Sequence, residues 1–341
     1  MIETARPAAI APVTAAGRPI LEIEGLRVGF PGPGGNPPTV VLDGVDLTIR
    51  QGEILGLVGE SGSGKSMLAL AAMGLLPAPG RVLSGAIRIE GRDLTSLSER
   101  AWQQLRGGTL GMVFQDPMTG LNPVRSIGAT LGESIRRHQR VAASDVARIA
   151  EAALRAVGIP AARERLSAYP HQLSGGLRQR VMIALALVNR PRVIIADEPT
   201  TALDATIQAQ ILDLLRERLH HAEGAGGLMI THDLGVAAEV CDRIAVIYHG
   251  RIVETGQTRE VLADPRHPYT AGLLAAVPRF DGRGRRLVPI PGQPPGPAAE
   301  RISCSFRPRC ARASEACSAA PALSPPVQGR SVACHHSGGG Q

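Results

Sequence analysis

The feature that most constrains the fold of this chain is a glycine-rich segment, GESGSGKS, at Gly59–Ser66. It matches the phosphate-loop pattern G-x-x-x-x-G-K-[ST] and joins an apolar run, Glu53–Val58, that predicts a buried strand to a helix expected over Lys65–Leu76. Glycines let backbone N–H groups converge on phosphate oxygens, and the helix adds its positive N-terminal end. We therefore predict a nucleotide site contacted by Gly59, Ser61, Gly62, Ser63, Gly64, Lys65 and Ser66.

The composition singles out one residue of this loop. Of the 37 basic residues in the 341-residue chain, Lys65 is the only lysine, and all the others are arginines. A compact ammonium differs in shape from a planar guanidinium. We infer that this position requires the small, point-like charge of a lysine. We expect Lys65 to reach the β- and γ-phosphates of ATP, and Ser66 to supply a hydroxyl to Mg²⁺.

A pair of acidic residues ends another apolar run. Val193–Glu198 reads VIIADE, which predicts a buried strand with two carboxylates at its carboxyl end. We expect Asp197 to hold Mg²⁺ through water and Glu198 to act as the general base for an attacking water.

The remaining pattern predicts a mixed architecture. Alternating apolar and polar residues over 21–28 and 40–49 are typical of half-buried antiparallel strands. Strands at 111–114, 193–196, 228–231 and 244–248 interleave with helices, including one at 206–221, which favours a largely parallel sheet with covered faces. Helical periodicity over 127–138, 144–157 and 176–188 predicts an inserted helical subdomain at about 118–181. No apolar run approaches the ~20 residues of a membrane span.

Several further motifs resemble those of a known protein family. Leu173–Arg180 reads LSGGLRQR, just before the acidic strand, and resembles the signature motif of ABC ATPases. Gln115 resembles their Q-loop residue, 202–204 (Ala-Leu-Asp) their D-loop, and His232 their switch histidine. Phe30 stands where the family places an aromatic that stacks on adenine. The resemblance implies catalytic roles for Glu198, His232 and Gln115, a contribution of Gln115 to the Mg²⁺ site, and nucleotide contacts from Phe30, Ser174, Gly175, Gly176 and Asp204.

The resemblance also implies a fold and a partner. It implies an α/β, ABC-type P-loop ATPase core with an antiparallel β subdomain and an inserted helical subdomain, plus a small Cys-containing C-terminal domain. In ABC proteins the signature motif faces the phosphate loop of a second ATPase subunit, so ATP is buried between two chains. We expect a disordered leader at 1–19, the nucleotide-binding domain at 20–256, and a C-terminal extension at 257–341.

The sequence of the C-terminal extension resembles that of one branch of this family. His267–Pro278 (HPYTAGLLAAVP) and Pro289–Pro295 (PIPGQPP) resemble the extension of dipeptide and oligopeptide importer ATPases. This implies a subunit that powers peptide import from the cytoplasmic face of the membrane. Its implied partners are a second ATPase, most often a paralogue, two permease subunits and an extracytoplasmic binding protein.

Two alternatives remain open at the level of sequence. Nickel importers share much of this extension, so nickel or another small solute is an alternative cargo. Nine arginines against three acidic residues between Val277 and His336 give the tail a net charge of +6. A basic tail keeps open a non-transport ABC ATPase acting on nucleic acid, although we expect no direct nucleic-acid contact.

Four of the five cysteines gather in the tail with the spacing C-x₅-C-x₆-C-x₁₆-C. A cysteine cluster in a cytosolic protein suggests metal more than disulfides. The quartet resembles that of peptide-importer ATPases, some of which hold an iron–sulfur cluster. We therefore expect Cys304, Cys310, Cys317 and Cys334 to ligate a 4Fe–4S cluster, with zinc, helped by His335 or His336, as the alternative metal. Free or disulfide-linked thiols are the alternative to a metal site.

Overall fold

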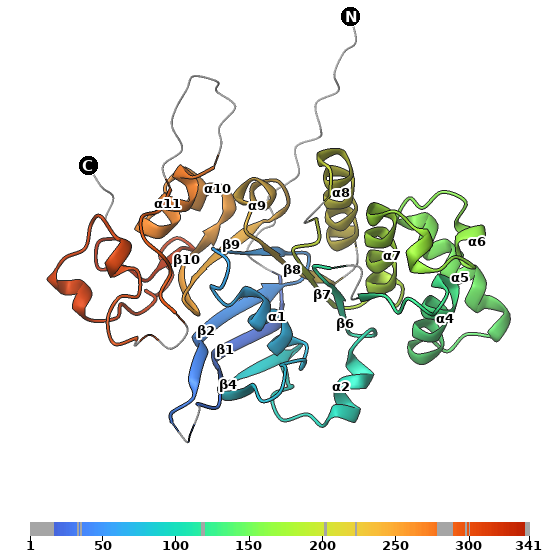
Figure 1. Cartoon of the computed structure of the whole chain (residues 1–341), viewed down its shortest axis with the longest axis horizontal. Coiled ribbons are helices and arrows are strands. Elements are labelled where there is room, and N and C mark those ends of the chain that lie inside the picture. Colours follow the sequence, from blue (N-terminus) through green and yellow to red (C-terminus); the bar gives the residue numbers. More distant parts are fainter. Residues whose placement is uncertain are drawn as a thin grey trace, which may run out of the picture.

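The computed structural model describes residues 17–32, 34, 36–116, 120–200, 203–221, 224–277, 289–296, 299 and 301–337, with only the backbone at 220 and 221. Most of the predicted leader and the arginine-rich stretch 278–288 therefore lie outside the described residues. Two sheets form the centre of the molecule (Figure 1). A helical group stands at one end of these sheets and the C-terminal segment at the other (Figure 1).

The smaller sheet is antiparallel, with the order β2-β1-β4-β5. It consists of β1 (Pro19–Phe30), β2 (Thr39–Arg50), β4 (Arg81–Ile89) and β5 (Arg92–Asp93). The pairing of β1 with β2 confirms the antiparallel pair predicted from alternation. In β2 the apolar side chains of Val45, Leu47 and Ile49 are buried while Asp46 between them is exposed, as one covered face requires.

The larger sheet has the order β11-β10-β9-β3-β8-β7-β6. Its strands are β3 (Ile54–Val58), β6 (Leu110–Val113), β7 (Val193–Asp197), β8 (Gly226–Thr231), β9 (Arg243–Tyr248), β10 (Arg251–Gln257) and β11 (Ser331–Val332). Strands β6, β7, β8, β3 and β9 are parallel, and β10 and β11 run antiparallel at one edge. Every residue of β3, β7 and β8 is buried, which explains why these strands are apolar apart from Asp197 and Thr231 at the ends of β7 and β8.

Helices cover these strands and form the separate group. They are α1 (Lys65–Ala72), α2 (Glu99–Leu105), α4 (Ile127–His138), α5 (Ala143–Ala156), α6 (Ala162–Arg165), α7 (Gly175–Leu187), α8 (Ala205–His221), α9 (Leu234–Val240), α10 (Thr258–Ala263) and α11 (Pro268–Ala275). Helices α4 to α6 make the green group beside the sheets (Figure 1), and α7 packs on both α5 and β6. No helix within the described ranges has the length and apolarity needed to cross a membrane.

Helix α1 ends earlier than the sequence predicted. Gly74 adopts a left-handed φ of 61°, and the N–H of Leu75 bonds to the carbonyl of Leu70 at 2.8 Å, which is a Schellman ending. The guanidinium of Arg106 donates to the carbonyls of Met73 and Gly74 and satisfies groups that the helix leaves free.

The C-terminal segment packs directly on the core formed by the rest of the chain. Strand β11 extends the larger sheet by pairing with β10. Phe306 is buried, and its ring meets the rings of Tyr248 at 5.3 Å and Tyr269 at 5.4 Å, in an aromatic cluster shared with β9 and α11. The expected separate Cys-containing domain is therefore not confirmed, because this segment shares the core of the rest of the chain.

A buried histidine in this cluster makes stability depend on pH. His267 is 2% exposed, and its Nδ1 accepts the N–H of Tyr269 at the start of α11. Burial lowers the pKa of His267 to about 4, whereas an exposed histidine titrates near 6.5. Below about pH 6.5 the unfolded chain takes up a proton that the folded chain refuses, so stability is lost as the pH falls toward 4.

We expect the free energy of unfolding to fall by about 1–2 kcal/mol more in wild type than in His267→Asn between pH 7 and pH 5. Asn keeps an oxygen acceptor for the helix start but does not titrate. Urea unfolding at the two pH values measures the difference. Identical pH dependence in the two proteins would contradict the assignment.

Candidate functional site

The phosphate loop joins β3 to α1 in a conformation that depends on its glycines. Gly62 and Gly64 have φ values of 77° and 108°, in the left-handed region that other residues rarely adopt. A Cβ on Gly59 would lie 2.3 Å from the carbonyl oxygen of Ile247, so the backbone passes too close for any side chain. The loop therefore has the backbone freedom and close approach that the sequence motif predicted.

Lys65 lies buried at the start of α1 inside this loop. Its Nζ donates to the carbonyl oxygens of Gly59 at 2.8 Å and Glu60 at 2.9 Å. Burial lowers the pKa of Lys65, and the negative charges of Glu198, Asp197 and Glu60 act in the opposite direction. The ammonium is thus held close to three carboxylates by the loop's own backbone.

Asp197 ends β7 next to this loop and fits a magnesium site. Burial raises the pKa of its carboxyl, and a hydrogen bond from the hydroxyl of Ser66 opposes that rise. Its Oδ1 is buried and has no hydrogen-bond partner among the described residues. A buried carboxylate oxygen without a partner beside a hydroxyl is an oxygen donor set suited to Mg²⁺.

Glu198 follows Asp197 and meets two other predicted residues. Gln115 Nε2 donates to Glu198 Oε2 at 3.0 Å, and His232 Nδ1 lies 3.1 Å from Glu198 Oε1. Glu198 has a φ of 44°, a left-handed conformation that turns the chain sharply after the strand, and its N–H bonds to the carbonyl of Ile230 on β8. The structure therefore brings together the three residues predicted to be catalytic, from the ends of β6, β7 and β8.

The signature residues lie at the start of α7. Ser174 caps this helix by accepting the N–H of Leu177 at 3.4 Å, and both Ser174 and Gly175 are exposed. A Cβ on Gly175 would meet open space, whereas one on Gly176 would lie 3.2 Å from the side chain of Ile207. Helix α7 thus presents an exposed N-terminus that is free of bulky side chains at its first residue.

One further residue of this motif has a contact that the sequence did not reveal. Gln179 is buried, and its Nε2 donates to the carbonyl oxygen of Pro199 at 2.6 Å. The bond ties the signature helix to the residue directly after Glu198. Only its place in the LSGGLRQR motif marked Gln179 in the sequence.

Two further residues predicted to contact the nucleotide have structural contacts of their own. Asp204 caps α8 by accepting the N–H of Ile207 at 3.0 Å, while 201 and 202 lie outside the described residues. Phe30 ends β1 in the antiparallel sheet, with its ring close enough that a Cβ on Gly80 would lie 2.7 Å from it.

The predicted iron–sulfur cluster is wrong, and so is the zinc alternative. Within the parts of the chain that the structure describes, no three His, Cys, Asp or Glu side chains are arranged to hold a metal ion. His335 Nε2 lies 3.0 Å from the carbonyl oxygen of Ala319, and His336 Nε2 lies 2.8 Å from the Ser314 hydroxyl, so both imidazoles have other partners.

The four tail cysteines instead pack as free thiols. Cys317 is buried, while Cys304 and Cys310 pack against the hydrophobic core. Burial raises the pKa of Cys304 and of Cys334, which keeps these thiols protonated. The spacing suggested ligands because it shows proximity in sequence but not the direction of each side chain, and the tail is ordered by its packing on the core instead.

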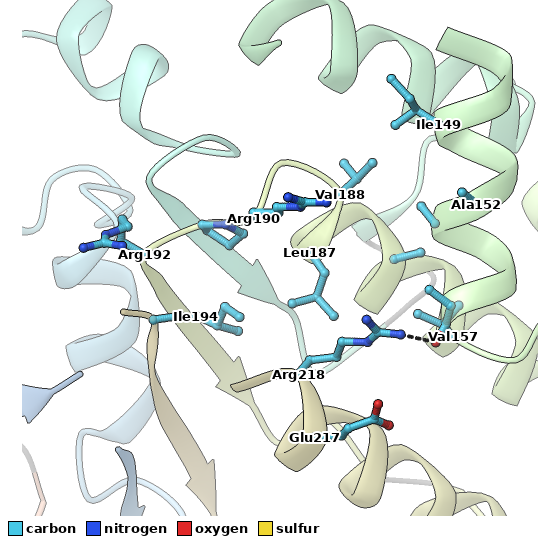
Figure 2. A pocket seen from close by; sticks show the side chains of 15 residues that line it. Ile149, Ala152, Val157, Leu187, Val188, Arg190, Arg192, Ile194, Glu217 and Arg218 are labelled. Atoms are coloured by element: carbon cyan, nitrogen blue, oxygen red, sulfur yellow. Dashed lines mark hydrogen bonds between the residues drawn. The ribbon is translucent and has the colours of Figure 1, made fainter. Parts of the chain in front are cut away.

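A cavity of about 790 Å³ lies away from these residues. Figure 2 shows its apolar walls from α5 and α7, including Ile149 and Leu187, with Arg190, Arg218 and Glu217 around them. It meets β7 near Ile194, toward the start of the strand whose other end carries the acidic pair. None of the predicted nucleotide residues lines this cavity.

Comparison with known proteins identifies the family to which the chain belongs. The family described as ABC transporter matches residues 42–201, and that described as oligopeptide/dipeptide transporter, C-terminal region, matches residues 253–317. The oligopeptide transport ATP-binding protein OppD of Salmonella typhimurium is 47% identical over 315 residues, covering 92% of this chain and 93% of that protein. The dipeptide transport ATP-binding protein DppD of Escherichia coli is 45% identical over 318 residues, covering 93% and 96%.

Comparison with solved structures shows that the chain has the fold of an ATP-binding cassette. The dimeric ATP-binding cassette MJ0796, in a post-hydrolysis state bound to ADP and Pi, is 27% identical with a TM-score of 0.62. The match covers 70% of this chain and 99% of that one.

Proposed function

This chain belongs to the ABC transporter family, in its oligopeptide and dipeptide branch, and from this premise we propose that it hydrolyses ATP to power the import of peptides. The observation that carries the proposal is the meeting of Gln115, Glu198 and His232 beside the phosphate loop, at the carboxyl ends of three strands. The family accounts for an ATPase coupled to transport. Similarity to named oligopeptide and dipeptide transport proteins supports peptides as the cargo.

We assign the nucleotide contacts from the geometry of the loop. The loop's N–H groups and the Lys65 ammonium bind phosphate oxygens, and this ammonium exchanges its bonds to Gly59 and Glu60 for bonds to phosphate. Ser66, Asp197 and Gln115 hold Mg²⁺, which offsets the charge of the phosphates when bound. Phe30 is assigned to adenine, and Asp204 to the neighbourhood of the nucleotide.

We assign Glu198 as the general base. Its carboxylate takes a proton from the attacking water, while Gln115 and His232 fix its two oxygens in position. The exposed fraction of its side chain is only 15%, which keeps the base out of bulk water, whereas the His232 side chain is 62% exposed. His232 thus lies where a second subunit or the γ-phosphate reaches it.

We propose that the active form contains two ATPase subunits. Ser174 and Gly175 are exposed at the start of a thirteen-residue helix, an arrangement that binds anions. The structural neighbour MJ0796 is described as dimeric with ADP and Pi. Ser174, Gly175 and Gly176 would then contact the nucleotide held by the partner's phosphate loop, and we propose a paralogue as that partner.

We further propose a peripheral subunit at the cytoplasmic face of the membrane. Residues 20–256 form the nucleotide-binding domain and 257–341 the extension in this proposal. The partners are two permease subunits and an extracytoplasmic binding protein, as expected for a subunit of a peptide importer. Nickel, another small solute and nucleic acid are less well supported, because the relatives named here are oligopeptide and dipeptide transport proteins.

Reconstitution tests the proposal. The chain, two permease subunits and a paralogous ATPase from the same organism are placed in vesicles with the binding protein outside and ATP inside. We expect ATP-dependent uptake of a labelled tripeptide and no uptake of labelled nickel. ATP hydrolysis with uptake of nickel alone would contradict the peptide assignment, and no ATP hydrolysis would contradict the function altogether.

The contact between Gln115 and Glu198 gives a specific pH prediction. Replacing Gln115 with Glu puts a second carboxylate within hydrogen-bond distance of Glu198, and like charges raise the pKa of a carboxyl. We expect the acid limb of the pH–rate profile of ATP hydrolysis to move upward by about 1–2 units. Gln115→Asn, which is shorter but neutral, should lower the rate without moving that limb. An unmoved limb in Gln115→Glu would show that this contact does not act on the base.

A further inference from the structure

The second residue of the phosphate loop, Glu60, is held through each of its polar groups. Its carbonyl oxygen accepts from Lys65 Nζ at 2.9 Å. Its N–H donates to the hydroxyl oxygen of Tyr269 on α11 at 2.7 Å. Its carboxylate receives two hydrogen bonds from Arg309, Nη1 to Oε2 at 2.6 Å and Nη2 to Oε1 at 2.9 Å. Two of these three partners come from the C-terminal extension, more than 200 residues away in sequence.

Arg309 is itself fixed by residues of the extension and by Tyr248 of β9. Its side chain is 3% exposed, its Nε donates to the carbonyl oxygen of Pro291 at 2.8 Å, and its guanidinium lies 5.9 Å from the ring centres of Tyr248 and Phe306. The paired carboxylate raises the pKa of the guanidinium further. This bidentate salt bridge from a buried arginine fixes the position of the Glu60 carboxylate and keeps it ionised.

The charge of Glu60 matters because of where it lies. A carboxylate within a phosphate-binding loop repels the phosphates that the loop is built to receive. Glu60 also counts among the acidic groups that act on Lys65. Arg309 neutralises this carboxylate from the side of the C-terminal extension, so that the loop keeps a net attraction for anions.

We infer that Arg309 and Tyr269 of the C-terminal extension are positioning residues for ATP, which act through Glu60 to hold the phosphate loop in shape and to cancel its negative charge. The inference rests on the proposed function, since the affected ligand is ATP. It gives the extension a part in nucleotide binding in addition to its packing on the core.

Equilibrium binding of a fluorescent ATP analogue to the full-length chain tests this inference. Arg309→Gln should raise the Kd about three- to tenfold, because the loop loses its anchor and gains an uncompensated charge. Adding Glu60→Gln to Arg309→Gln should restore most of the affinity, since the repelling carboxylate is then gone. Tyr269→Phe, which keeps the ring packing, should raise the Kd about two- to fivefold and serves where Arg309→Gln does not fold.

Arg330→Gln is the matched control. Arg330 also anchors the extension, with a side chain 6% exposed and Nη2 at 2.9 Å from Glu254 Oε1, but its partners Glu254 and Asp264 lie outside the phosphate loop. We expect its Kd to stay within about twofold of wild type even if its melting temperature falls.

The outcomes separate the two proposals. Equal Kd values for Arg309→Gln and Arg330→Gln, or a weakened Arg309→Gln that Glu60→Gln does not restore, would overturn the inference and leave the proposed function intact. Where only Tyr269→Phe folds, a Kd equal to that of wild type overturns it. A wild-type chain that does not bind ATP would overturn both.

Discussion

Replacing Glu198 with Gln should slow ATP hydrolysis by about 10²–10⁴-fold and leave ATP affinity nearly unchanged. Gln has the size of Glu and keeps one oxygen that accepts a hydrogen bond, so the contact with Gln115 at 3.0 Å survives in the variant. An amide is no base, however, and cannot take the proton of the attacking water. The loss therefore falls on the chemical step and not on binding.

Single-turnover hydrolysis and equilibrium binding of ATP measure the two effects separately. Glu217→Gln is the control, because it makes the same chemical change beside the cavity in Figure 2, away from the phosphate loop. The control should hydrolyse ATP at the wild-type rate. Turnover of Glu198→Gln at the control's rate would remove Glu198 from the role of base.

The second large effect concerns Lys65, the only lysine of the chain. Lys65→Arg should lower kcat/KM for ATP by about 10²-fold or more, because a donor aimed at the transferring phosphate is lost. The ammonium is buried and fits between two carbonyl oxygens at 2.8 and 2.9 Å, and a forked guanidinium is too large for that place. Normal turnover by Lys65→Arg would show that the site needs only a positive charge.

An amine-reactive probe tests the same residue without changing the site. Besides the α-amino group, wild type has one side-chain amine to label, and ATP should protect it. Arg18→Lys adds an exposed amine outside the loop as a control. ATP should leave the labelling of residue 18 unaffected, and labelling of Lys65 that ATP does not slow would contradict its contact with phosphate.

The meeting of Gln115, Glu198 and His232 could be predicted from the sequence because the signals for it are local. The phosphate loop and the pair Asp197–Glu198 combine a required residue type with a strand that is buried along its whole length. Parallel strands end at one edge of a sheet, so motifs at the ends of β6, β7 and β8 had to meet there.

The strands that the sequence failed to indicate lack such local signals. In β4 only Ile87 and Ile89 are buried, and its pairing with β1 is interrupted by shifts in register. Strand β11 has two residues, and only its pairing with β10 defines it. The salt bridge from Arg309 to Glu60 spans 249 residues, and no periodicity in the chain points to it.

The tail cysteines illustrate the opposite error. Their clustering in the tail suggested that they ligate one metal centre, but the tail is ordered by aromatic packing around Phe306 and by buried arginines. Cysteines in such a setting are small apolar side chains, whose spacing follows the packing of the segment.

The position of β11 also determines the effect of removing the C-terminal extension. Strand β10 would otherwise form the end of the larger sheet, with its backbone groups open to pairing with another molecule. The pairing of β11 at Glu254 and Thr255, and the bond from the N–H of Ala333 to the carbonyl of Val253, cover this edge. A chain cut after Gln257 would keep every nucleotide motif but expose a strand edge that invites aggregation. The short segment from Ser331 to Ala333 thus closes an edge of the core that the chain would otherwise leave open.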